Sequence, residues 1–170
     1  MVHHIPIAQP CSLAILDLSG CNVILDFLPL LCKNLRSLLL PGCGLDQVQA
    51  YLIADFLLSN AKLEELHLQD NPNMGFAGLS AICRALALTN RTVKYLDIQG
   101  CLLSDDLEPV VAQMVSRNTS LKYLILDRMV ATWPCEALMR LSGAFNQNTG
   151  LRIVGVPTIN AVYLDLFSRF

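Results

Sequence analysis

The chain of 170 residues is long enough for one ordinary domain. Hydrophobic residues make up 54% of it and charged residues only 15%, at a mean hydropathy of +0.48, which excludes a mainly disordered chain. A formal net charge of -2 and a pI of about 5.8 predict no general attraction to nucleic acid or to an anionic membrane surface.

The apolar composition does not predict a membrane protein. The longest uncharged stretch near the C-terminal end, 153–164, is interrupted by Gly155, Pro157 and Asn160, and no segment approaches the roughly 20 apolar residues that span a bilayer. No Lys or Arg precedes Lys33, so we expect no secretory signal. The seven cysteines are odd in number and form no Cys-x-x-Cys pair, which favours reduced thiols, a cytoplasmic location and no structural zinc.

One nine-residue pattern recurs along nearly the whole chain: leucine-x-x-leucine-x-leucine-x-x-(asparagine or cysteine). Its six copies are Leu13–Cys21, Leu35–Cys43, Leu63–Asn71, Val93–Cys101, Leu121–Met129 and Leu151–Ile159, and the last two have lost the final asparagine or cysteine. The inner apolar residues alternate with period 2, which predicts short strands with one buried face. We therefore expect one continuous core built from Leu16, Leu18, Leu38, Leu40, Leu66, Leu68, Leu96, Ile98, Leu124 and Leu126.

The residue that closes the pattern must turn the chain inward, where its side chain can satisfy backbone groups of neighbouring coils. Cys21, Cys43 and Cys101 occupy this position, as Asn71 does in the third copy. These cysteines are therefore expected to be buried structural thiols and not metal ligands or nucleophiles.

The segments between the predicted strands favour helices. The first connector, 24–32, is short and contains Pro29, so we expect only a turn of helix there. Later helices are predicted over 46–59 with a capping box at Asp46 and Gln49, over 76–88, over 105–117 capped by Ser104, and over 133–147 capped by Thr132.

An asparagine follows each of the later helices, three residues before the next apolar strand position: Asn60, Asn90, Asn118 and Asn148. With the recurring leucine pattern, this spacing resembles the ribonuclease-inhibitor-like class of leucine-rich repeats, which includes ribonuclease inhibitor, NOD-like receptors, tropomodulin and Ran GTPase-activating proteins. The resemblance implies an α/β leucine-rich-repeat solenoid: a right-handed β-α horseshoe of about six repeats, with a parallel concave sheet and helices outside. We expect repeats over 13–159, an N-terminal segment or thin cap over 1–12, and a C-terminal tail or cap over 160–170.

Stacking the strands in parallel places the intervening positions in columns on the concave sheet. Tyr95 and Tyr123 are neighbours in one column, and amphipathic aromatic side chains among mixed charges are typical of protein-binding hot spots. The predicted partner-binding residues are Glu65, His67, Lys94, Tyr95, Asp97, Lys122, Tyr123 and Asp127.

A relay of Ser37, His67 and Asp97 can be drawn on the same sheet, but an open face offers neither a dry pocket nor an oxyanion hole. We therefore expect a non-catalytic module without a cofactor or metal, which binds another protein, binds no nucleic acid and does not span a membrane. Three alternatives stay open: a part of a larger receptor or adaptor, the GTPase-activating role that the resemblance allows, and a secreted effector of a host-associated microbe. Self-association through the apolar end at 162–170 is a further option.

Overall fold

The computed structural model describes residues 12–30, 34–101, 105–126 and 133–155, and within them strands alternate with helices. The strands are β1 (Ile15–Asp17), β2 (Ser37–Leu39), β3 (Glu65–His67), β4 (Tyr95–Asp97), β5 (Tyr123–Ile125) and β6 (Ile153–Gly155). The α-helices are α1 (Gln47–Ser59), α2 (Gly75–Leu88), α3 (Glu108–Arg117) and α4 (Cys135–Gln147). Three 3-10 helices, η1 (Leu25–Leu30), η2 (Pro72–Met74) and η3 (Asp105–Leu107), complete the described elements.

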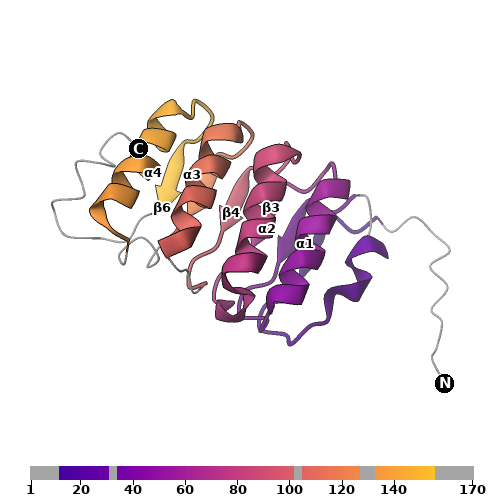
Figure 1. Cartoon of the computed structure of the whole chain (residues 1–170). Coiled ribbons are helices and arrows are strands. Elements are labelled where there is room, and N and C mark those ends of the chain that lie inside the picture. The colour runs from indigo at the N-terminus through magenta and orange to yellow at the C-terminus, as the bar shows by residue number, and fades with distance from the viewer. Residues whose placement is uncertain (1–11, 31–33, 102–104, 127–132, 156–170) are drawn as a thin grey trace, which may run out of the picture.

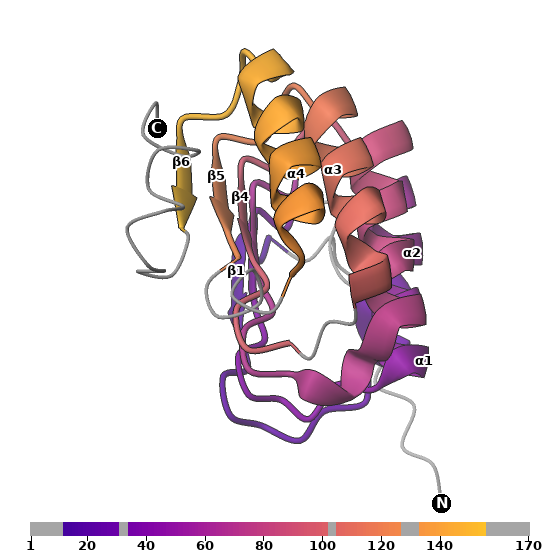
Figure 2. The same ribbon diagram turned by 60° about the vertical axis from the view of Figure 1, so that its left-hand side comes forward.

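The strands form one parallel sheet in the order β1-β2-β3-β4-β5-β6, which is the order of the sequence (Figure 1). Figure 2 shows the sheet as one layer and α1–α4 as a second layer that covers one of its faces. Strands in a sheet lie about 4.8 Å apart, whereas packed helices lie about 8–10 Å apart, so the coil curves with the sheet on its inner side. The predicted six-repeat solenoid is confirmed.

The register of the sheet follows the phase of the repeats. Ile15 pairs with Ser37, Ser37 with Glu65, Glu65 with Tyr95, Tyr95 with Tyr123, and Tyr123 with Ile153. Equivalent repeat positions therefore lie side by side, and the predicted columns are confirmed. We call the face of this sheet opposite the described helices the sheet face.

The core lies between the sheet and the helices. In the second to fifth repeats, every predicted core residue is fully buried, from Leu38 and Leu40 to Leu124 and Leu126. The first repeat departs from the prediction, because Leu16 and Leu18 are only half-buried and pack at the margin of the core. Since β1 is the first strand in the sheet order, its side chains have a described neighbouring strand on one side only.

The closing position of the repeat joins successive coils where it is buried. The amide nitrogen of Asn71 donates to the carbonyls of Leu40 at 2.8 Å and Leu68 at 2.9 Å, and its side-chain oxygen accepts from the backbone N–H of Leu45 at 3.1 Å. Asn71 is fully buried, so these bonds satisfy backbone groups that water does not reach.

Two cysteines occupy the same position in the same way. Cys43 and Cys101 are buried, and their thiols donate to the carbonyls of Leu18 at 3.0 Å and Leu68 at 3.3 Å, respectively. Cys21 was expected to match them, but it is exposed, so this prediction is wrong. Cys21 belongs to the first repeat, and the donor that reaches back to this repeat's Leu18 carbonyl is Cys43 of the second.

The starts of the described helices can be compared with the predicted capping residues. The capping box of α1 is present, because the Asp46 carboxylate accepts from Gln49 N and the Gln49 side chain accepts from Asp46 N. The segment that starts at residue 105 is a 3-10 turn before α3, and α4 begins at Cys135, two residues later than predicted, after Pro134 in an extended conformation. The predicted caps Ser104 and Thr132 lie outside the described residues. None of the described helices combines the length and apolar content that crossing a bilayer requires.

The asparagines that follow the helices form a second ladder. The side-chain oxygen of Asn90 accepts from the backbone N–H groups of Thr92 and Val93, both at 3.1 Å, while its amide nitrogen donates to Leu57 O at 3.0 Å in the preceding repeat. Asn60, Asn118 and Asn148 make the same pair of turn contacts within their own repeats. Each of these side chains ends one helix and aligns the strand that follows.

Candidate functional site

Three aromatic side chains lie in a row on the sheet face. The ring of His67, on β3, stacks on the ring of Tyr95, on β4, with 4.6 Å between centroids and 23° between planes. Tyr95 in turn lies 6.1 Å from Tyr123, on β5, at an angle of 35°. We call these three residues the aromatic patch. The predicted adjacency of the two tyrosines is therefore present, and His67 extends it by one strand.

The aromatic patch offers rigid, amphipathic surface. Tyr123 has 37% of its surface exposed, and Tyr95 and His67 are partly exposed. Burial, and then the charge of Asp97, raises the pKa of the Tyr95 hydroxyl, so this group stays a neutral hydrogen-bond donor and acceptor. Rings already stacked on one another lose little freedom when a partner covers them, which favours binding.

The two predicted acidic residues on these strands differ in their surroundings. The carboxylate of Glu65 accepts a hydrogen bond from the hydroxyl of Ser37 on β2. Asp97 is 8% exposed and accepts from the backbone N–H of Gln99 at 3.0 Å. Asp97 therefore lies at the floor of the site and not at its solvated border, whereas Glu65 is exposed.

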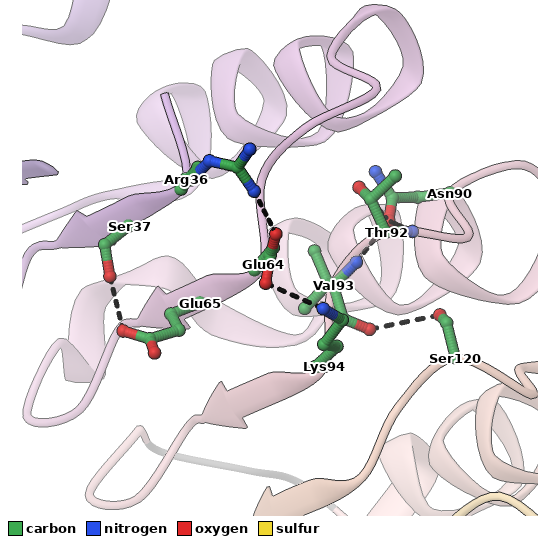
Figure 3. Close-up of polar contacts among 9 residues, drawn as sticks. All are labelled: Arg36, Ser37, Glu64, Glu65, Asn90, Thr92, Val93, Lys94 and Ser120. Carbon is green, nitrogen blue, oxygen red and sulfur yellow. Dashed lines mark hydrogen bonds and ion pairs between the residues drawn. The ribbon is translucent and has the colours of Figure 1, made fainter. Parts of the chain in front are cut away.

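The predicted basic residues lie at the edge of the sheet face where the strands begin. Lys94 forms an ion pair with Glu64 at 2.7 Å, and Glu64 is also paired with Arg36 (Figure 3). The hydrogen bond from Lys94, helped by the charges of Lys94 and Arg36, holds the pKa of Glu64 below its usual value. Lys122 is partly exposed, and its ammonium lies 3.4 Å from Thr119 O. Asp127, the eighth predicted residue, lies outside the described residues.

A basic concavity at this edge was missed by the sequence prediction of site residues. It has a volume of about 350 Å³ and is lined by four cations and one carboxylate: Arg36, Lys62, Arg91, Lys94 and Glu64. The sequence does contain a signal for two of these cations, because Lys62 and Arg91 both follow shortly after the asparagines that end α1 and α2. Only the register shows that they lie beside the cations of the strand positions.

The arrangement does not support the Ser-His-Asp relay drawn from the sequence. The hydroxyl of Ser37 donates to Glu65, and the ring of His67 stacks on Tyr95. Over the residues that the structure describes, no group of three or more His, Cys, Asp or Glu side chains is placed to hold a metal ion.

Comparisons with known proteins match this architecture. A family model described as Leucine Rich repeat matches residues 59–83. Ribonuclease inhibitor of Mus musculus is 34% identical over 97 residues, which cover 56% of this chain and 21% of that protein. The NACHT, LRR and PYD domains-containing protein 14 of Homo sapiens is 29% identical over 169 residues, which cover 92% of this chain and 15% of that protein. This chain thus spans about a fifth or less of the length of both relatives.

Among solved structures, the one titled Leiomodin-1 Actin-Binding Site 2 is similar with a TM-score of 0.66 and 22% sequence identity. The similarity covers 79% of this chain and 80% of that chain. At this identity the likeness shows a shared fold.

Proposed function

Because the chain is a leucine-rich-repeat protein with repeats like those of ribonuclease inhibitor and the NACHT, LRR and PYD domains-containing proteins, we propose that its sheet face binds another protein. The aromatic patch of His67, Tyr95 and Tyr123 is the centre of the proposed contact, and the chain acts without catalysing a reaction. Ribonuclease inhibitor itself is named for a protein that it inhibits.

The observation that carries this proposal is the row of three rings on adjacent strands, in which His67 stacks on Tyr95 and Tyr123 lies tilted beside Tyr95. Aromatic side chains of this kind dominate the energy of many protein interfaces, particularly where they lie at the centre of the contact. The charged residues around the patch, such as Glu65 and Lys122, would set the association rate and the salt dependence more than the affinity.

The test compares a double variant of the patch with a matched variant elsewhere. Tyr95→Ala with Tyr123→Ala removes both phenol rings from the sheet face, while Tyr51→Ala removes an exposed tyrosine of α1, which is 41% exposed. Proteins captured from a cytosolic lysate by the unaltered chain are identified by mass spectrometry, and each is then titrated calorimetrically against the three chains.

We expect the double variant to bind its partner at least about thirtyfold more weakly, since two such anchors together contribute about 2 kcal/mol or more. Tyr51→Ala should bind as the unaltered chain does, and all three chains should keep similar melting temperatures. Equal binding by the double variant would place the contact away from the aromatic patch and overturn the proposal.

A further inference from the structure

The basic concavity concentrates positive charge on a chain whose net charge is -2. Arg36, Lys62, Arg91 and Lys94 line it, and Glu64 is its one acidic residue. It lies at the edge where β2, β3 and β4 begin, beside the C-terminal ends of α1 and α2. Lys122 and Arg152 occupy the equivalent edge positions of the next two strands, so the positive edge continues along the sheet.

One of these cations, Arg91, stabilises the C-terminal end of a helix. The C-terminal end of a helix carries partial negative charge, which a cation offsets. Arg91 serves this purpose, because its guanidinium donates to the carbonyls of Leu86 at 3.0 Å and Ala87 at 3.2 Å in α2 and to its neighbour Asn90 O at 2.9 Å.

The other three cations are held differently. Lys62 donates to the side-chain oxygen of Asn34 at 2.6 Å, while Arg36 and Lys94 share the carboxylate of Glu64 from opposite sides (Figure 3). The side chains of Arg36 and Lys94 are 60% and 55% exposed, so both have donors left for a further anion. Glu64, with 31% of its side chain exposed, marks where a carboxylate fits between two cations.

We propose that this concavity binds a glutamate- or aspartate-bearing segment of the protein partner. The proposal rests on the proposed function, since it names the chemistry of what the sheet face binds. Glu64 and Lys94 directly precede Glu65 and Tyr95 in the strands, so the concavity and the aromatic patch adjoin. One partner surface with acidic residues beside an apolar contact would cover both.

A peptide carboxylate suits the site better than a phosphate does. Arg36 and Lys94 directly precede β2 and β4, so they are two strand spacings apart, about 10 Å, and Glu64 before β3 lies between them. A compact dianion in this position would meet the carboxylate of Glu64 directly. Single charges distributed along an extended segment can alternate with Glu64 and pair with each cation in turn.

The test uses a synthetic peptide of alternating glutamate and serine, with the same peptide carrying glutamine as its control. Binding to the full chain is followed by NMR amide shifts at low ionic strength. The variants are Glu64→Gln, which frees Arg36 and Lys94; Lys62→Gln, which removes one lining cation; and Arg84→Gln, which makes the same charge change on the exposed side of α2. Melting temperatures show that each variant is folded.

We expect the glutamate peptide to shift amides around Arg36, Lys62 and Lys94, with an affinity that falls as salt is added. Glu64→Gln should tighten binding and Lys62→Gln should weaken it, each by about threefold to tenfold, while Arg84→Gln should leave it nearly unchanged. Tighter binding by Glu64→Gln together with weaker binding by Lys62→Gln is specific to an anion held in the concavity, because a purely structural role of Glu64 would not make its loss improve binding.

Four results would overturn the proposal. The first is the absence of amide shifts around Arg36, Lys62 and Lys94 at millimolar peptide, and the second is equal binding of the glutamine peptide. The third is a loss of affinity in Arg84→Gln equal to that in Lys62→Gln. The fourth is tighter binding of inorganic phosphate or a single-stranded oligonucleotide than of the peptide. The peptide experiment does not depend on the tyrosines. The acidic-segment proposal can therefore fail while Tyr95→Ala with Tyr123→Ala still weakens partner binding. If the peptide binds as expected and the double tyrosine variant binds its partner as the unaltered chain does, only the aromatic contact is refuted.

Discussion

The first and third repeats carry the same leucine pattern but differ in what surrounds it. In the third repeat, Leu66 and Leu68 are fully buried, and the closing Asn71 joins two coils through its hydrogen bonds. In the first, Leu16 and Leu18 are half-buried and the closing Cys21 is exposed. The pattern therefore provides residues suited to burial, and neighbouring repeats on both sides provide the burial itself, as expected for a solenoid in which each repeat contacts only its neighbours.

The largest expected effect is on stability, when equivalent leucines are truncated in the two repeats. Leu66→Ala should lower the free energy of unfolding by about 2–5 kcal/mol, because the surrounding core cannot collapse into the cavity from either side. Leu16→Ala should cost about 1 kcal/mol, since much less apolar surface leaves the core. Urea denaturation of both variants measures the difference, and equal losses would contradict a stability that depends on flanking repeats.

A second comparison contrasts the reactivity of buried and exposed cysteine thiols. Burial raises the pKa of Cys83 and of Cys101 to about 12 and also raises the pKa of Cys43, whereas Cys21 and Cys135 are exposed. At pH 8 the exposed pair should react with an alkylating reagent at least about a hundredfold faster, because the buried thiols must wait for local opening. Peptide mapping by mass spectrometry over time resolves the two groups, and rapid labelling of Cys43 would remove its structural role.

The same experiment under denaturant tests the expected redox state. All seven thiols should then be titrated without reductant. Recovery of five or fewer from fresh protein would mean that disulfides form in the native chain.

Much of the fold followed from the sequence because the repeat fixes it locally. The strand register, the inner leucines of the middle repeats and the capping box at Asp46 each depend on spacing within one repeat or between adjacent ones. The exposure of Cys21 could not be predicted in this way, because it depends on what lies beyond the first strand. The start of α4 was also misplaced, since the predicted range 133–147 includes Pro134, which instead precedes the helix.

The candidate site likewise has a part that the repeat spacing predicts and a part that it does not. The columns placed Tyr95 beside Tyr123, and their adjacency is present. The stacking of His67 on Tyr95 and the burial of Asp97 depend on side-chain rotamers and on the packing of neighbours, which spacing alone does not specify. The basic concavity was missed because its cations come from three different positions of the repeat.

A third and smaller loss of stability is expected at the closing position. Asn71→Ala removes the acceptor of the Leu45 N–H and the amide donor of the Leu40 and Leu68 carbonyls, of which Leu68 O keeps the Cys101 thiol as a donor, and this should cost about 1–3 kcal/mol. Cys21→Ala should change stability by less than about 0.5 kcal/mol, since its side chain is exposed.

Asn71→Cys is the matched control for this position, because Cys43 and Cys101 fill it in neighbouring repeats. This variant should recover part of the loss, as its thiol can still donate to a carbonyl. Thermal melts of the three variants would contradict the role of Asn71 if alanine and cysteine were equally destabilising.

The smallest expected effect concerns two carboxylates whose pKa values are lowered for different reasons. Hydrogen bonds from the side chain and backbone of Ser19, at 2.5 and 3.0 Å, lower the pKa of Asp17 within its own repeat. The pKa of Glu64 is lowered mainly by Lys94 and also by Arg36, both from neighbouring repeats. Lys94→Gln should therefore raise the pKa of Glu64 towards its usual value and leave that of Asp17 unchanged.

Both lowered values affect stability with the same sign. A carboxylate whose pKa is lower in the folded state favours folding above its unfolded pKa of about 4, and this contribution is lost as the pH falls through the folded value. Carbon-13 NMR titration of the side-chain carboxyls from pH 7 to pH 2 measures each pKa. Salt should weaken the shift of Glu64 more than that of Asp17, because ion pairs between exposed side chains are screened while a hydrogen bond inside one turn is not. Equal movement of both carboxyls in Lys94→Gln would mean that the first repeat is coupled to the inner ones more strongly than its half-buried leucines indicate.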